Sequence, residues 1–182
     1  LVFQEDYERF FAGVERTRSG EMIFVEVRSK VTTETRYIPA GDHAAEAVII
    51  HPREQDLEYY VDHSGDTFFI VTNADGAVNA KLVAAPVDNP GRANWTELVA
   101  HRPEVKLEGV QAFARHLLLS EREQGLQRLV VRSIADGTGH EIEQPEPVFM
   151  VSAGGNHVFD TDVIRFYYTS MVTPMSAIDY DV

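Results

Sequence analysis

Short runs of apolar, β-branched and aromatic residues recur along this chain at a nearly constant interval. The sequences MIFVEV, TFFIVT, HLLLSE and VIRFYY begin at residues 22, 67, 116 and 163. Several of the runs alternate apolar with polar residues, as half-buried strands do. Self-similarity at a fixed interval of this length is typical of repeat architectures. The pattern therefore predicts about four copies of one β-rich unit.

Each unit contains further runs of the same kind. One precedes the central run (RFFAGVE, LEYYVD, LEGVQAF, PVFMVSA), one follows it (TTETRYI, NAKLVAA, LQRLVV, MSAIDYD), and three units carry a fourth (EAVIIHP, WTELVAH, HEIEQP). Four antiparallel strands in about 48 residues is the size of a propeller blade. We predict an all-β fold, a β-propeller portion of about four blades in which the last lacks one strand, with approximate blade boundaries 9–52, 57–102, 107–145 and 147–182.

Gly and Asp separate the predicted strands, because they tolerate the positive φ and the side-chain hydrogen bonds of tight turns. The predicted turns are Ser64-Gly65-Asp66, Asp75-Gly76, Gln124-Gly125 and Asp136-Gly137. Propellers close with typically 4 to 8 blades. Two interpretations follow: either LVFQED forms a strand that completes the last blade, which gives a small closed interaction scaffold, or the chain is an open arc whose two flanks are exposed and pair with a second copy.

The composition restricts the kinds of partner that the protein is expected to bind. The formal net charge is −13, and such a surface repels nucleic acid phosphates. Two interpretations of the acidity follow: it attracts cationic ligands, or it only keeps the protein soluble. No apolar run approaches the ~20 residues that span a bilayer, and no leader is visible after Leu1. Cysteine is absent, which is compatible with a cytoplasmic location. We expect no nucleic acid partner, no membrane association and no cofactor.

Asp62, His63 and Ser64 are the three residue types of a serine hydrolase triad. A triad requires that the base reach the nucleophile and that the third group reach the base. Neighbours on a strand point to opposite faces, so the side chains of Asp62 and His63 diverge. This string is therefore interpreted as a strand that ends in a turn.

The remaining candidates show no ligand pattern. The histidines have neither an i, i+4 pair nor a zinc spacing, and they are His43, His51, His63, His101, His116, His140 and His157. His51 and His101 recur at matching blade positions, which favours a structural strand-end hydrogen bond. Asp160 and Asp162 lack the rest of a calcium loop, and Gly154-Gly155 lacks the Lys-Ser/Thr of a phosphate loop.

Four arginines near strand ends have two open interpretations. They either latch the propeller to a partner domain or are solvated strand-end charges, and most exposed charges contribute little. These residues are Arg16, Arg18, Arg28 and Arg122.

Three long stretches carry a family resemblance: REQDLEYYVDHSGDTFFIVTN, NWTELVAHRPEVKLEGVQAFARHLLLSEREQGLQRLVV and FDTDVIRFYYTSMVTPMSAIDYDV. They resemble the propeller of the oligopeptidase B (protease II) branch of the prolyl oligopeptidase family of serine peptidases, and VRSKVTTETRYIPA and ERFFAGVERTRSG fit the same region. The resemblance implies a larger enzyme in which a propeller restricts access to an α/β-hydrolase catalytic domain that cleaves short peptides after Arg or Lys.

The family's nucleophile lies in a G-x-S-x-G elbow, and no such motif occurs in this sequence. We therefore expect no catalytic residue, no metal ligand and no cofactor-binding residue in this chain. We expect it to have no peptidase activity alone, and to act with the catalytic domain of its parent on short basic peptides.

Overall fold

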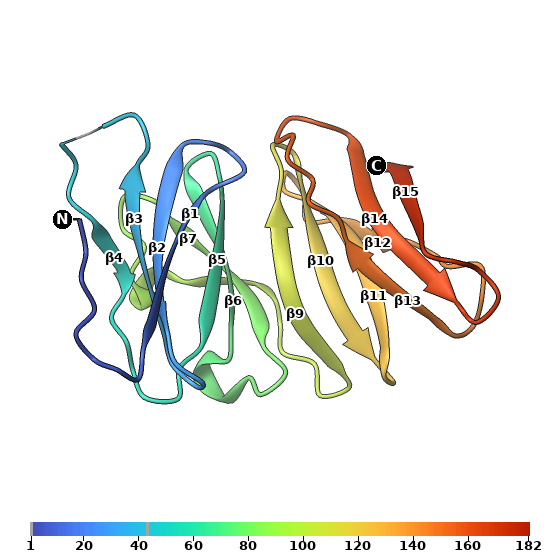
Figure 1. Cartoon of the computed structure of the whole chain (residues 1–182), viewed down its shortest axis with the longest axis horizontal. Helices are drawn as coiled ribbons and strands as arrows, with labels where there is room; N and C mark the ends of the chain where they lie inside the picture. Colours follow the sequence, from blue (N-terminus) through green and yellow to red (C-terminus); the bar gives the residue numbers. More distant parts are fainter. Residues whose placement is uncertain (1, 43) are drawn as a thin grey trace.

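The computed structural model describes residues 2–42 and 44–182. Within them, fifteen strands form four antiparallel sheets that follow one another along the longest axis of the molecule (Figure 1). In the first three sheets four strands pair in chain order, and the last has three strands. We refer to these sheets as blades 1 to 4. The all-β expectation is confirmed.

The strands begin and end close to the predicted runs. Blade 1 contains β1 (Phe11–Arg16), β2 (Met22–Arg28), β3 (Thr33–Pro39) and β4 (Val48–His51), and blade 2 contains β5 (Tyr59–Ser64), β6 (Thr67–Thr72), β7 (Lys81–Pro86) and β8 (Thr96–Val99). Blade 3 contains β9 (Val105–Ala112), β10 (His116–Glu123), β11 (Leu126–Ser133) and β12 (Gly139–Glu141), and blade 4 contains β13 (Phe149–Ala153), β14 (Val163–Ser170) and β15 (Ser176–Asp181). Two short 3-10 helices, η1 (Ala74–Gly76) and η2 (Arg92–Asn94), connect strands of blade 2.

The tight turns use the residues that the sequence indicated. Gln124 and Gly125 join β10 to β11 with φ values of 50° and 85°. Positive φ at both central residues matches the right-handed twist of the flanking strands. Gly65, with a φ of 59°, lies in the turn from β5 to β6.

The core consists of apolar clusters between neighbouring blades. Phe68 and Ile70 of β6 pack toward blade 1, whereas Phe69 and Val71 of the same strand pack toward blade 3. Successive side chains of a strand point to opposite faces, so a strand between two blades is buried on both sides. This explains why TFFIVT is a continuous apolar run, while β14 alternates buried with exposed residues.

The two flanks of the molecule differ. On blade 4, the outward face exposes Met150, Val163 and Tyr167. The blade 1 flank is instead lined by residues of the N-terminal segment 2–10, whose Glu5 forms an ion pair of 2.7 Å with Arg53.

The expectation that LVFQED forms a strand is wrong for residues 2–6, and Leu1 lies outside the described residues. The segment packs on blade 1 because Arg36 and Arg53 lie over the rings of Phe3 and Phe10, at 4.7 and 4.2 Å from the ring centroids. The two ends of the chain lie far apart (Figure 1). No strand of the described residues pairs with the outer edge of β15, so the ring is not closed.

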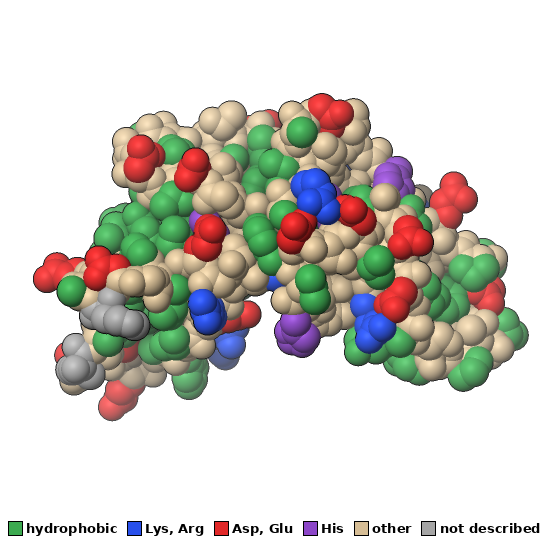
Figure 2. Space-filling view, turned by 90° about the horizontal axis from the view of Figure 1, so that it is seen from above, with side chains coloured by type: hydrophobic (Ala, Val, Ile, Leu, Met, Phe, Trp, Pro, Cys, Tyr) green, Lys and Arg blue, Asp and Glu red, His purple; other side chains and the backbone are tan. Residues whose placement is uncertain are grey.

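Seen from above, the molecule has the outline of an arch that is concave along one edge, and acidic side chains are scattered over the face in view (Figure 2). Across residues 2–42 and 44–182, no helix has the length and apolar character needed to cross a bilayer.

Candidate functional site

The C-terminal ends of three inner strands meet at the turn between β1 and β2. Asp62 lies near the end of β5, Ala112 ends β9, and Asn156 follows β13. Arg18 in the β1–β2 turn contacts all three. We call Arg18, Ser19, Asp62, His63, Ala112 and Asn156 the inner-strand junction. It joins side-chain and backbone groups of all four blades.

Arg18 is the centre of this junction. Its Nη1 donates to the Asp62 carboxylate and to the carbonyl oxygen of Ala112, both at 3.2 Å, and its Nε donates to the carbonyl oxygen of Asn156 at 2.5 Å. The guanidinium also lies over the Phe113 ring, 4.8 Å from the centroid. Only 12% of the Arg18 side chain is exposed. A planar guanidinium suits such a site because its donors point in several fixed directions.

Asp62 joins blade 2 to blade 3 as well as to Arg18. Its carboxylate accepts hydrogen bonds from the backbone N–H of Ala112 at 2.7 Å and from its neighbour His63 at 2.8 Å. Burial raises the pKa of Asp62, while the Ala112 hydrogen bond and the Arg18 charge act in the opposite direction. The ion pair with Arg18 is thus partly withdrawn from solvent, where charge attraction is stronger than on an open surface.

His63 faces away from Asp62 and toward the β1–β2 turn. Its side chain is fully buried, and its Nδ1 is hydrogen-bonded to the Ser19 hydroxyl at 2.8 Å. Burial lowers the pKa of His63, so the ring is neutral at pH 7. Ser64 is the last residue of β5 and leads into the turn at Gly65. The triad interpretation therefore fails on geometry, as the alternation of the strand predicted.

Asn156 supplies the side of the junction that belongs to blade 4. Its amide donates to Gln111 Oε1 at 3.0 Å and to the carbonyl oxygen of Arg165 at 3.0 Å, and its Oδ1 accepts from the Arg165 N–H at 2.7 Å. Its φ is 44°, a value that Asn adopts more readily than most residues. A Cβ on nearby Gly154 would lie 2.7 Å from the Arg165 carbonyl oxygen, so the close approach requires glycine there.

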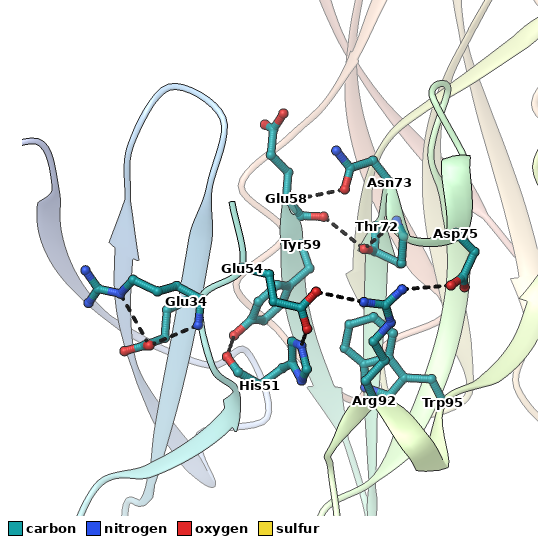
Figure 3. Close-up of polar contacts among 12 residues, drawn as sticks. Glu34, His51, Glu54, Glu58, Tyr59, Thr72, Asn73, Asp75, Arg92 and Trp95 are labelled. Atoms are coloured by element: carbon teal, nitrogen blue, oxygen red, sulfur yellow. Dashed lines mark hydrogen bonds and ion pairs between the residues drawn. The ribbon is translucent and has the colours of Figure 1, made fainter. Parts of the chain in front are cut away.

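A second polar network connects blades 1 and 2 (Figure 3). His51 Nε2 contacts Glu54 at 2.6 Å, Glu54 accepts from Arg92 at 3.0 Å, and Arg92 also donates to Asp75 at 2.7 Å. The strand-end hydrogen bond predicted for His51 is confirmed. The prediction for His101 is not met, because its buried Nε2 has no hydrogen-bond partner within the part of the chain that the structure describes.

Tyr59 lies behind this network and holds the two blades together. Its hydroxyl donates to the His51 carbonyl oxygen at 2.5 Å and accepts from the Thr35 N–H at 2.7 Å. Thr33 exchanges hydrogen bonds with the Tyr59 backbone. The ring is fully buried and packs against Trp95 with its centroid 5.9 Å away.

The other candidate side chains lie outside the two networks. Arg16 donates twice to the Gly20 carbonyl oxygen in its own turn, and Arg122 pairs with Glu108. Arg28 is exposed. Asp160 and Asp162 both pair with Arg115. Among the described residues no group of three or more potential ligands is placed to hold a metal ion, and His43 lies outside them.

The sequence did not reveal the junction. Arg18 was one of four arginines with two open interpretations, and Asn156 was not considered. One signal was available: the β1–β2 turn has five residues, 17–21, whereas the β5–β6 turn has only Gly65 and Asp66. An arginine at the tip of a lengthened turn can reach neighbouring blades. The Ser19 hydroxyl meets His63 Nδ1 in this junction, but the His63 ring is fully buried and the Asp62 carboxylate contacts Arg18 and Ala112 instead of the ring nitrogens. These contacts are of the kind that hold strands in place.

Comparison with known proteins agrees with this architecture. The family described as "Prolyl oligopeptidase, N-terminal beta-propeller domain" matches residues 1–182. "Dipeptidyl aminopeptidase BI" of Pseudoxanthomonas mexicana is 39% identical over 96% of this chain and 24% of its own length. "Protease 2" of Moraxella lacunata is 29% identical over the same shares of the two chains.

Solved structures give the same result. Oligopeptidase B from Trypanosoma brucei, in a closed form with covalently bound antipain, superposes with a TM-score of 0.93 at 29% identity, over 100% of this chain and 27% of that one. Oligopeptidase B from Leishmania major superposes with a TM-score of 0.91 at 25% identity, over 99% of this chain and 27% of that one. The chain thus spans about a quarter of the length of these relatives. The resemblance seen in the sequence is confirmed, and the chain belongs to the N-terminal β-propeller domain family of the prolyl oligopeptidases.

Proposed function

We propose that this chain is the access-restricting propeller portion of an oligopeptidase B-like serine peptidase that cleaves short peptides after Arg or Lys. The observation that carries the proposal is the superposition on the Trypanosoma brucei oligopeptidase B with a TM-score of 0.93 over the whole chain. In the parent protein, the catalytic α/β-hydrolase domain is the partner of this chain. The division into blades at 9–52, 57–102, 107–145 and 147–182 is part of the same proposal.

Two properties of the chain support a non-catalytic role. No G-x-S-x-G motif occurs among its 182 residues, and Asp62 and His63 are committed to structural contacts on opposite faces of β5. The net charge of −13 favours the approach of basic peptides by long-range attraction. We propose a cytoplasmic location, which the absence of cysteine supports, and which fractionation of cells that express the parent protein tests.

A second candidate specificity is favoured by one observation. The relative from Pseudoxanthomonas mexicana, 39% identical, is named a dipeptidyl aminopeptidase. An enzyme of that kind removes two residues from a free N-terminus, whereas an endopeptidase also accepts blocked peptides. The two candidates share the role of the propeller and differ in the substrate of the parent enzyme.

The parent enzyme distinguishes these candidates with two fluorogenic substrates. Release from an N-terminally blocked peptide ending in Arg supports the first candidate, and release only from an unblocked dipeptide supports the second. Turnover of a folded protein as fast as that of a short peptide contradicts the access-restricting role. The 182-residue chain alone is expected to release no fluorophore from either substrate.

The isolated chain is also proposed to pair with itself through blade 4. This flank exposes Met150 and Tyr167, of which 65% and 42% are accessible, and carries an Arg165–Asp179 ion pair that a second copy turned by a two-fold axis can exchange. The exposed β15 edge and apolar patch are features that favour association. Sedimentation equilibrium tests this, and a Tyr167→Lys variant is expected to be more monomeric. A wild-type chain that stays monomeric at high concentration contradicts the proposal.

A further inference from the structure

We propose that Arg18 is a positioning residue that sets the angular spread of the four blades, and with it the width of the opening that the inner strands surround. This inference rests on the proposed access-restricting function. It adds a particular residue, a mechanism and a substrate property, namely the size of the peptide that is admitted.

The first step is connectivity. Neighbouring blades are held together by broad apolar clusters, which connect blade 1 to 2, 2 to 3 and 3 to 4. Such clusters are non-directional, and polar contacts such as the hydrogen bond from the Ala112 N–H to Asp62 each join only two neighbouring blades. Within the described residues, the hydrogen bond from Arg18 Nε to the Asn156 carbonyl oxygen is the one that joins blade 1 directly to blade 4. It therefore constrains the sum of the three angles between neighbouring blades.

The second step is the geometry of the contact. Arg18 acts at the ends of the inner strands, where Asp62, Ala112 and Asn156 each supply an oxygen. These hydrogen bonds from one side chain hold the ends of the inner strands at fixed separations. A cavity of about 250 Å³ lies beside it, lined by Arg18 and Asp62 together with Glu15 and Gln111. Movement of the β1–β2 turn therefore changes the space next to the inner strands.

The third step is the chemistry of the side chain. The partly buried guanidinium is balanced by the Asp62 carboxylate and by two carbonyl oxygens. Lysine has a single, compact charge and cannot present donors in the same fixed directions. Methionine keeps much of the apolar contact with Phe113 but has no donor. Comparing Arg18→Lys with Arg18→Met therefore separates the effect of the charge from the effect of the directed hydrogen bonds.

Arg16 provides a matched control. It lies in the same hairpin and has the same charge, but its Nε and Nη2 donate only to the Gly20 carbonyl oxygen, two residues beyond Arg18. Arg16→Met therefore removes a guanidinium and one charge without removing a contact between blades.

The test is a distance measurement on the 182-residue chain. Because the chain has no cysteine, two introduced cysteines can be spin-labelled specifically. Lys30 and Met171 are exposed and lie in equivalent turns, between the second and third strands of blades 1 and 4. Pulsed electron resonance then reports the distribution of distances between the first and last blades.

We expect Arg18→Met to shift this distribution to longer distances and to broaden it, and Arg18→Lys to give an intermediate result. Arg16→Met is expected to match the unsubstituted chain. If Arg18→Met lowers the melting temperature but leaves the distances of the folded chain unchanged, Arg18 is only a stabilising residue and the proposal is wrong. If Arg18→Met does not fold, the Arg18→Lys and Asp62→Asn distributions decide the question by the same criterion.

The parent enzyme supplies the functional readout. Arg18→Lys is expected to raise kcat/KM for long peptides relative to short ones, with kcat for the shortest peptide unchanged. An unchanged length dependence together with altered distances contradicts the proposed access-restricting function but leaves the mechanical role of Arg18 intact. An altered length dependence without altered distances contradicts the role of Arg18 and leaves the access-restricting function standing.

Discussion

The hydroxyl of Tyr59 offers a sharp test of how blades 1 and 2 are joined. Tyr59→Phe deletes one oxygen atom, which donates to the His51 carbonyl oxygen and accepts from the Thr35 N–H. The ring and its contact with Trp95 remain. The effect on stability therefore comes from two backbone groups of blade 1 that lose a partner supplied by blade 2.

The magnitude follows from the burial of these groups. A buried polar group left without a partner costs about 1–3 kcal/mol. Thr35 is buried and bears this cost in full, whereas His51 is half-buried, so that water partly replaces the hydroxyl. We expect the free energy of unfolding to fall by about 2–4 kcal/mol. For a urea dependence of about 2–3 kcal/mol per M, the midpoint decreases by about 1 M.

Urea unfolding followed by fluorescence measures this change directly. Trp95 is the single tryptophan of the chain and lies at the same junction. Tyr60→Phe is the matched control, because Tyr60 is 42% exposed and its hydroxyl makes only a 3.4 Å contact with Glu58. We expect it to change stability by less than about 0.5 kcal/mol. Equal midpoints for the two variants would refute the assignment of Tyr59 as a tie between blades.

Three further predictions concern titration and backbone packing. Burial lowers the pKa of His63 and His116 below the ordinary value of 6.5. The stability that the two neutral rings contribute is therefore fully present above pH 6.5 and is lost as pH falls through the lowered pKa values. Replacing both residues by Gln should flatten the acid limb of a plot of melting temperature against pH. Burial raises the pKa of Tyr59 to about 12, so the stability that its hydroxyl contributes is intact below pH 10 and is lost toward pH 12. Urea unfolding at a series of alkaline pH values tests this. If Tyr59→Phe loses stability as steeply as the wild type, the prediction is wrong. Gly154→Ala should lower the free energy of unfolding by about 1–3 kcal/mol, because the new Cβ lies 2.7 Å from a carbonyl oxygen, whereas Gly13→Ala, with open space around it, is the control whose midpoint should not move.

Much of the fold could be predicted because the information is local. The central strands β2, β6, β10 and β14 are encoded by apolar and β-branched runs, and the turn at Gln124-Gly125 by residues that adopt positive φ. Repetition of one pattern at a nearly constant interval then indicated the blade architecture. The prediction for LVFQED failed because strand propensity does not specify a partner. The Phe3 ring of this segment packs against the guanidinium of Arg36 in blade 1, and residues 2–6 lie on that blade without forming a strand.

The sequence by itself thus determined the strands, their order within each blade and the family to which the chain belongs. Only the tertiary structure decided which side chains connect the blades, because those contacts join residues that are far apart in the chain. Arg18 and Asn156 are separated by 138 positions, and no spacing rule relates them. The two copies of the His51 motif also differ: His51 meets Glu54, which is held in turn by Arg92 of blade 2, whereas the Nε2 atom of His101 is buried without a partner among the described residues. Equivalent positions in a repeat share a backbone, but their side-chain contacts depend on the neighbouring blade, which is different at every junction.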